Sequence, residues 1–482
     1  MPRKKLNRKH TQVKSRQKKI EFVVKTRNNK IVPISIVIVG FILNIVAFWP
    51  GFMTQDSWFQ YLQAKSGDYQ DGHPPIMALL WSLLLNFASG PSGMLILQLS
   101  FFWMALYLVW VKYRNKPNAF LITLSGTFPW IVSLSGVVWK DLQMTFSLIL
   151  AIGLILGKKT KKRIIAVLLL LFYAYSVRKN APLAVAPIIL YAIVSWWDMK
   201  RSRIAALFAL TLVGFSAFGN ILNYSILDAT RSNIQNASYI DDLSYLSLEQ
   251  KRSLIPHISY ADIVSCKEDT VAGSNLIGKE GCLLTRPSYQ DYLRFKPILQ
   301  EHWIKSIFAN PKGYIQLHAE VFTYQLIKPS SPPYGYWVTP GVIPDATEIK
   351  QSDNFVTKQI KGIVDFCINN FQWVFKPLFW FGVLLWIIYP VRYLKDSRVR
   401  SLMQAIVFSG ILYTLGYFII GGSADYRYFY WPVLAANLSI VLLVVHKKDL
   451  VLPTEFHKIR IGVAALLIAI TLLTLPNLIA LF

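Results

Sequence analysis

Long apolar segments recur along this sequence, and short polar or basic segments separate most of them. Several are near the short end of the roughly 17–25 residues that an α-helix needs to cross a bilayer. The pattern predicts an all-α polytopic membrane protein with about eleven transmembrane helices. The predicted crossings are residues 31–48, 94–111, 119–135, 142–157, 164–177, 181–197, 204–222, 372–391, 402–421, 430–445 and 461–481.

Two stretches do not fit a simple membrane-spanning pattern. Residues 77–87 are apolar but short, and Pro74-Pro75 before them favours a helix start, so we predict an interfacial helix. Residues 223–371 are mixed in character, which predicts one large external segment with helical patches around 247–254, 289–307 and 311–326. Four parts follow: a tail, 1–30; an N-terminal transmembrane module, 31–222, with a first external loop at 51–93; an extracytoplasmic segment, 223–371; and C-terminal transmembrane helices, 372–482.

The composition supports the membrane assignment and accounts for the strong positive charge. Of 482 residues, 54% are hydrophobic and 16% are charged, and the mean hydropathy is +0.39. A net charge of +26 would suit nucleic acid, but its distribution argues against that partner. Six segments predicted to be cytoplasmic, 1–30, 112–118, 158–163, 198–203, 392–400 and 446–460, contain 31 of the 51 Lys and Arg residues and 5 of the 25 Asp and Glu residues. The whole excess of positive charge lies on one side, as the positive-inside rule requires.

This charge pattern predicts an orientation with the N-terminus in the cytoplasm and the C-terminus outside. The orientation holds only if residues 77–87 do not cross, because a crossing there would turn Lys112, Arg114 and Lys116 outward. The basic tail is predicted to bind anionic lipids of the inner leaflet. Residues 31–48 are too long and too far from the N-terminus for a typical cleaved signal peptide.

The three cysteines indicate no metal site. Cys266 and Cys282 both lie in the external segment, where a disulfide and two free thiols are both open. Cys367 has no evident partner, and no Cys/His spacing resembles a zinc site.

Four polar motifs are predicted to lie on the outer face, and the densest of them follows the first crossing. The stretch GFMTQDSWFQYLQAKSGDYQDGHPP includes Asp56, Gln60, Tyr61 and His73. The other three motifs are Trp139-Lys140-Asp141, Arg178-Lys179-Asn180 and Asp425-Tyr426-Arg427-Tyr428. Charged groups near lipid are costly unless they are paired or used, so this convergence indicates a functional site.

Each motif also has a purely structural interpretation. Asp56 could cap a short helix, His73 could be an interfacial histidine, and Arg178 could anchor lipid headgroups. Lys140 with Asp141, and Asp425 with Arg427, could be structural ion pairs. Asp68 and Asp71 are expected to be solvated turn residues. The aromatic residues of these motifs are expected mostly in an interfacial belt: Trp58, Trp81, Trp139, Tyr426, Tyr428, Tyr430 and Trp431.

The residue types suit the transfer of a sugar from a lipid phosphate. Lys140, Arg178 or Arg427 could stabilise the negative charge on a phosphate leaving group. An acceptor hydroxyl needs a general base, and Asp56 is the best placed candidate. Because no nucleotide sugar is available outside the cell, a lipid-linked donor is expected.

At these residues the chain resembles the GT-C superfamily of membrane glycosyltransferases, which includes protein O-mannosyltransferases and aminoarabinose transferases of lipid A. In that superfamily an acidic residue lies in the first external loop, and Asp56 matches it. An interfacial helix with a double proline then leads into the second crossing, as in HPPIMALLWSLLLNFASGPSGMLILQLS. The pattern MTxDSxxQ…GHPP with WKD, RKNA and DYRYxYWP is similar to bacterial branches of the superfamily.

The resemblance implies a GT-C-like fold in a bacterial plasma membrane and a polyprenyl-phosphate-linked sugar donor. The acceptor would be a cell-envelope polymer, lipid or protein, and transfer would invert the anomeric carbon. Asp56 would be the catalytic base or the acid that orients the acceptor, and Asp141 would be the second external acid. His73, where some relatives carry lysine, would lie near the donor phosphate with Lys140, Arg178 and Arg427. The remaining substrate contacts would come from Gln60, Tyr61, Trp139, Asn180, Asp425 and Tyr428.

Three points stay open at the level of the sequence. Some members of the superfamily use a divalent metal, which Asp56 and Asp141 could hold, and others do not. A transporter or flippase of a lipid-linked saccharide would also need external cations and aromatic residues. A non-enzymatic envelope-assembly protein would instead carry its function in residues 223–371.

Overall fold

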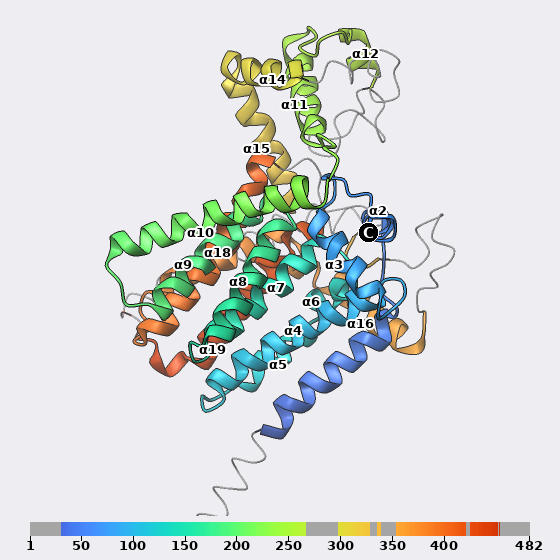
Figure 1. Cartoon of the computed structure of the whole chain (residues 1–482). Helices are drawn as coiled ribbons and strands as arrows, with labels where there is room; N and C mark the ends of the chain where they lie inside the picture. The colour runs from blue at the N-terminus through green and yellow to red at the C-terminus, as the bar shows by residue number, and fades with distance from the viewer. Residues whose placement is uncertain are drawn as a thin grey trace, which may run out of the picture.

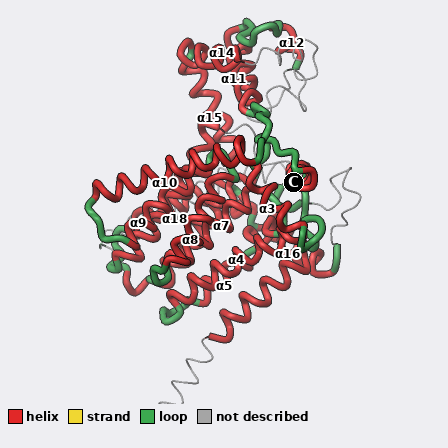
Figure 2. The backbone as a smooth tube through the Cα atoms, viewed as in Figure 1, coloured by secondary structure: helices red, strands yellow, loops and turns green. Residues whose placement is uncertain are grey.

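The structure is a computed structural model that describes residues 30–266, 297–327, 335–338, 353–420, 425–451 and 453. Within these residues the regular elements are helices, and the strand-like pairings are isolated bridges between loops (Figure 2). The prediction of an all-α protein is confirmed. The tail and the last predicted crossing, 461–481, lie outside the described residues.

Five described helices are long and apolar enough to cross a membrane, which confirms the prediction of a polytopic membrane protein. They are Lys30–Phe48, α4 (Ser92–Tyr113), α10 with the π-helical turn that follows it (Arg201–Ile226), α18 (Ser397–Ile420) and the helical stretch Tyr426–Val445. Shorter apolar helices accompany them: α3 (Pro75–Leu85), α9 (Ala181–Trp196) and α17 (Pro377–Val391). Two further helices, α7 (Lys140–Ile155) and α8 (Lys161–Ser176), match the predicted fourth and fifth crossings.

The long helices lie side by side in one bundle (Figure 1). Helix α19 (Tyr430–Val445) is at its centre, where it packs against α17, α18 and α7. Helix α10 has no buried residue, so it lies at the edge of the bundle, where its apolar side chains suit contact with lipid.

The third predicted crossing, 119–135, is not one helix, and this part of the prediction is wrong. It consists of α5 (Phe120–Leu124), a 3₁₀ turn (Ser125–Thr127) and α6 (Pro129–Ser135). Pro129 disfavours helical geometry at the residue before it, and Phe128 is extended. Gly126 packs so closely against α4 that an added Cβ would be 2.5 Å from Leu106 Cδ1. Hydrophobicity alone does not reveal this break.

The loops predicted to be cytoplasmic meet at one end of the bundle. Lys116 Nζ is 2.7 Å from Asp449 Oδ2, and Lys395 N donates to the carbonyl oxygen of Asp449 over 3.0 Å. Lys159 Nζ donates to the carbonyl oxygen of Trp196 over 3.1 Å. Basic loops that are distant in the sequence therefore share one end, as the charge pattern predicts.

The first external loop folds into two short helices. Helix α2 (Gln55–Ser66) ends at Gly67, which adopts a left-handed conformation with φ of 80°. Helix α3 begins at Pro75, as the double proline predicts. The indole of Trp81 donates to the carbonyl oxygen of Gly90 over 2.9 Å and ties α3 to the start of α4.

Part of the external segment projects beyond the bundle (Figure 1). It contains α11 (Gln235–Gln250), α12 (Tyr260–Ser265), α14 (Pro297–Ala309) and α15 (Pro311–Ile327), with a small core that includes Ile240, Leu243 and Leu299. The predicted helical patch at 311–326 matches α15. The patch at 247–254 falls on the end of α11, and residues 289–296 lie outside the described part.

Helix α16 (Phe355–Asn370) returns the chain to the bundle, where it packs against α6. The Thr357 hydroxyl donates to the carbonyl oxygen of Ala47 over 2.6 Å. Cys266 forms a disulfide, while its candidate partner Cys282 lies outside the described residues. Cys367 in α16 is a free thiol.

Candidate active site

Two of the outer motifs are joined by main-chain hydrogen bonds. Phe52 N donates to the carbonyl oxygen of Gly136 over 3.0 Å, and Val138 N donates to that of Phe52 over 2.8 Å. The Ser57 hydroxyl donates to the Val138 carbonyl oxygen over 2.6 Å. These bonds hold the start of α2 against the start of α7, so the loop that carries Asp56 lies beside Lys140.

Side chains strengthen this junction. The indole Nε1 of Trp139 donates to Thr54 Oγ1 over 2.7 Å, and Trp139 is 1% exposed. The guanidinium of Arg427 lies 4.5 Å from the centre of the Trp139 ring, a cation–π distance. Trp139 therefore connects three of the four outer motifs.

Arg427 contacts two carboxylates. Its Nη1 lies 2.9 Å from Asp56 Oδ2, and its Nε lies 2.8 Å from Asp425 Oδ2. The side chain of Asp56 is 31% exposed, whereas those of Arg427 and Asp425 are 10% and 9% exposed. Asp425 is therefore buried behind Arg427, and Asp56 is the carboxylate that a substrate can reach.

The second ion pair joins the remaining motif to α7. Arg178 forms a salt bridge with Asp141, which is 1% exposed. Arg178 Nε also donates to Asn180 Oδ1 over 3.3 Å. Its guanidinium lies 4.9 Å from the ring centre of Tyr428, which connects this pair to the Asp425–Tyr428 motif. Asp141 and Asn180 are buried and hold Arg178 in place.

His73 lies at the edge of the cluster, after the loop that follows α2. It stacks on Phe59, with ring centres 5.8 Å apart, and its Nδ1 is 3.5 Å from Gln60 Nε2. Gln60 is fully buried. Tyr61 contacts the rings of Trp58 and Trp81, so it is part of the hydrophobic core that the first external loop forms.

Lys140 differs from the two arginines. It is partly exposed at the first residue of α7, and no hydrogen bond or ion pair joins it to another described residue. The hydrogen bonds from Ser57 to Val138 and from Trp139 to Thr54 bring it beside Asp56, and its charge acts on both Asp56 and His73. Within the described part of the cluster, Lys140 and the exposed Lys179 are the cations that form no ion pair, and of these two Lys140 is the one whose charge acts on Asp56 and His73.

The charges of the cluster set the protonation of its outer groups. Burial raises the pKa of Asp56, but the positive charges of Arg427 and Lys140 outweigh it and lower the pKa to about 2. Burial and the charge of Lys140 lower the pKa of His73 to about 4. At neutral pH Asp56 is therefore ionised and His73 is neutral.

The described side chains do not fit a divalent metal. No group of three or more His, Cys, Asp or Glu residues that could hold a metal ion occurs among them. Asp56 and Asp141 each contact an arginine, and a metal would have to displace it.

The structure corrects two expectations about this face. Most of the expected interfacial aromatic residues are core residues: Trp81, Trp139, Tyr426, Tyr430 and Trp431 are at most 1% exposed. Asp71 is not a solvated turn residue, because it accepts hydrogen bonds from Tyr224 and Ser232. Asp68 is exposed, as expected.

Residues that the sequence did not single out also reach the cluster. Tyr336 and Trp337 lie in the turn-rich stretch of the external segment. Tyr336 contacts Tyr426 with ring centres 5.2 Å apart, and Trp337 contacts Phe52 at 6.1 Å. A short piece of the external segment therefore packs against two of the outer motifs.

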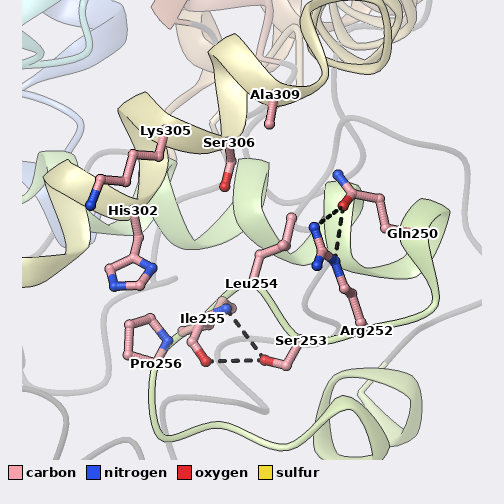
Figure 3. A pocket seen from close by; sticks show the side chains of 10 residues that line it. All are labelled: Gln250, Arg252, Ser253, Leu254, Ile255, Pro256, His302, Lys305, Ser306 and Ala309. Atoms are coloured by element: carbon pink, nitrogen blue, oxygen red, sulfur yellow. Dashed lines mark hydrogen bonds between the residues drawn. The ribbon is translucent and has the colours of Figure 1, made fainter.

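A hollow of about 310 Å³ lies elsewhere, between the end of α11 and α14 (Figure 3). Arg252, His302 and Lys305 contribute basic groups to it. None of the outer motifs lines this hollow, so it is separate from the cluster around Asp56.

Comparison with known proteins gives one distant similarity. No protein-family model matches the chain, and no curated protein matches it. Among solved structures, the chain is similar to the archaeal oligosaccharyltransferase AglB from Archaeoglobus fulgidus, in complex with an inhibitory peptide and a dolichol-phosphate. The match covers 92% of this chain and 54% of AglB, with 14% identity and a TM-score of 0.35. The chain thus spans about half the length of AglB, and a similarity this distant carries no conclusion about function.

Proposed function

We propose that this protein is a GT-C-like membrane glycosyltransferase that moves a sugar from a polyprenyl-phosphate donor to a cell-envelope acceptor outside a bacterial plasma membrane. The observation that supports the proposal is that a carboxylate and an unpaired cation lie at one site. A partly exposed carboxylate, Asp56, lies beside Lys140, a cation that forms no ion pair with a described carboxylate. Transfer from a lipid phosphate needs this combination, one group for the acceptor hydroxyl and one for the phosphate.

The proposed reaction is a direct displacement at the anomeric carbon. The acceptor oxygen forms a bond to that carbon, while the bond from the carbon to the phosphate oxygen breaks. Polyprenyl phosphate leaves with the electron pair of the broken bond, and Lys140 stabilises its charge. Asp56 receives the proton of the acceptor hydroxyl.

The low pKa of Asp56 shapes this step. A carboxylate with a pKa of about 2 is a weak base, so it does not remove the proton before the new bond begins to form. It instead orients the hydroxyl and takes the proton as the acceptor oxygen becomes acidic during bond formation. Arg427, fixed by Asp425 and Trp139, holds Asp56 in that orientation.

Donor binding to Lys140 variants tests the assignment of the phosphate site. We expect Lys140→Gln in the full-length protein, reconstituted in lipid nanodiscs, to bind a fluorescent polyprenyl-phosphate sugar at least tenfold more weakly. Lys140→Arg should retain most of the affinity. Lys116→Gln, at the opposite end of the bundle, is the matched control. Unchanged affinity in Lys140→Gln would contradict the assignment.

A transporter of a lipid-linked saccharide is the rival from another class. It would move the intact donor between leaflets of a proteoliposome without releasing free polyprenyl phosphate. A transferase releases polyprenyl phosphate only when an acceptor, such as a cell-envelope extract, is present. Movement without release would favour the transporter.

A further inference from the structure

The loop between α2 and α3 is joined to the beginning of the external segment by several hydrogen bonds. Asp71 Oδ2 accepts from the Tyr224 hydroxyl over 2.8 Å. Asp71 Oδ1 accepts from both the main-chain N and the hydroxyl of Ser232, each over 2.6 Å. Both carboxylate oxygens of Asp71 thus accept hydrogen bonds from a segment more than 150 positions away in the sequence.

Main-chain bonds reinforce the same junction. Asp71 N donates to the Thr230 carbonyl oxygen over 3.0 Å, and Thr230 N donates to that of Tyr69 over 2.9 Å. On the other side of the loop, Gln70 N donates to Gln63 Oε1 in α2 over 3.1 Å. The loop is therefore fixed from both sides just before it reaches His73.

The end of α10 is shaped to make this contact. The α-helix changes there into a π-helical turn (Leu222–Ile226), in which Leu227 N donates to the Leu222 carbonyl oxygen over 2.9 Å. Single π-helical turns of this kind occur frequently at functional sites. Tyr224 lies in this turn, and the Arg231 guanidinium lies 4.1 Å from its ring centre. The turn thus places the Tyr224 hydroxyl on Asp71.

His73 depends on the position of this loop. It is two residues beyond Asp71, and its described contacts are the stacking on Phe59 and the contact with Gln60. An added Cβ on the intervening Gly72 would lie 3.2 Å from Ser232 Oγ, so the two segments are in close contact here. A shift of the 224–232 segment would therefore move His73 relative to Lys140 and Asp56.

From this geometry we propose that Asp71 is a positioning residue. It holds His73 at the donor site by anchoring its loop to residues 224–232, the beginning of the external segment. The inference rests on the proposed glycosyl transfer, and it makes the external helices part of the donor site's support. A movement of α11 that shifts residues 224–232 would therefore also shift His73, through the hydrogen bonds of Tyr224 and Ser232 to Asp71.

A double-mutant cycle tests this role with the full-length protein. We expect Asp71→Asn to lower kcat/KM for the donor about tenfold, and Asp68→Asn, in the same loop but exposed, to leave it unchanged. In a His73→Ala background, Asp71→Asn should have no further effect, because both changes act through His73. A merely stabilising role would give the same loss in both backgrounds.

A second variant covers the case in which Asp71→Asn fails to fold. Tyr224→Phe removes one hydroxyl and keeps the ring, and it should show the same dependence on His73 with a smaller, roughly threefold effect. Equal effects of Tyr224→Phe with and without His73 would overturn the inference. If the wild-type protein itself releases no polyprenyl phosphate, the proposed function fails instead, so the two failures are distinguishable.

Discussion

Arg427 and Asp56 lie at opposite ends of the sequence, and Arg427 Nη1 is 2.9 Å from Asp56 Oδ2. The same guanidinium is held by Asp425 at 2.8 Å and lies over Trp139. A planar group with donors on two edges is needed to contact both carboxylates and the ring together. The contact joins the first external loop to the start of α19, and it leaves Asp56 as the more exposed of the two carboxylates.

Arg427→Lys tests whether that geometry matters. Lysine keeps the charge but cannot contact both carboxylates and stack on Trp139, so Asp56 loses its fixed orientation. We expect turnover to fall about 100-fold, measured as release of polyprenyl phosphate, while the affinity for the donor changes less than threefold. Turnover near that of the wild type would show that Arg427 does not orient Asp56.

The buried pair of Arg178 and Asp141 should dominate the stability of this face. Arg178→Ala leaves the Asp141 carboxylate buried without its partner, which we expect to cost about 3–5 kcal/mol of unfolding free energy. Adding Asp141→Asn should recover a large part of that loss. Lys116→Ala breaks a much more exposed pair and should cost less than about 1 kcal/mol. Unfolding in a denaturing detergent measures all three. An equal cost for Arg178→Ala and Lys116→Ala would contradict the burial of the first pair.

The pKa of His73 makes a prediction for donor binding. With a pKa of about 4, His73 stays neutral between pH 5.5 and 8, so the affinity for the donor should not change in this range because of His73. A histidine with its usual pKa of 6.5 would gain charge as the pH falls and bind the phosphate more tightly. Titration of a fluorescent donor at several pH values distinguishes the two cases. Tighter binding at pH 5.5 that disappears in His73→Ala would contradict the structure.

Asp241 in α11 makes a prediction for stability. Burial, and then the charge of Asp242, raise the pKa of Asp241 from 3.8 to about 7. The folded state disfavours the charged form of Asp241, so its ionisation lowers the free energy of unfolding. This loss is absent below about pH 4, grows as the pH rises, and is complete above about pH 7. Asp241→Asn should therefore stabilise the protein at pH 8, by at most about 4 kcal/mol, and change little at pH 4.

Thermal unfolding at the two pH values measures this effect. Asp228→Asn is the matched control, because Asp228 is exposed and asparagine tolerates its positive φ of 48°. Equal shifts of Tm at pH 4 and pH 8 in Asp241→Asn would show that Asp241 is charged at neither pH or at both.

Much of the fold follows from local features of the sequence. The apolar segments predict most of the helices, the distribution of Lys and Arg predicts which loops share an end, and Pro74-Pro75 predicts the start of α3. These three features act through the bilayer or through backbone geometry. Neither of these two effects depends on which residues become neighbours in the folded protein. The break in the third predicted crossing comes at Pro129, which disfavours helical geometry at Phe128, and a search for apolar segments does not report it.

The candidate site, like the fold, has features that the sequence predicts and features that depend on contacts between distant residues. The topology brings the four outer motifs together, and this convergence is found in the structure. The pair of Asp425 with Arg427, two residues apart, was among the candidates and is present, whereas Asp141 pairs with Arg178 and not with Lys140. The partners of Asp56 and Asp141 could not be predicted, because a carboxylate carries no local signal of which distant arginine it meets. Asp71 was expected to be solvated, and its partners Tyr224 and Ser232 lie in a different part of the chain. The roles assigned to the site residues stay predictions.

The most direct test of the proposed function compares the wild-type protein with Asp56→Asn in one assay. The full-length protein in nanodiscs receives a polyprenyl-phosphate sugar and a cell-envelope extract, and both release of polyprenyl phosphate and binding of the donor are measured. We predict that Asp56→Asn binds the donor within threefold of the wild type and releases polyprenyl phosphate at least 100 times more slowly. Release by Asp56→Asn at the wild-type rate would contradict the account.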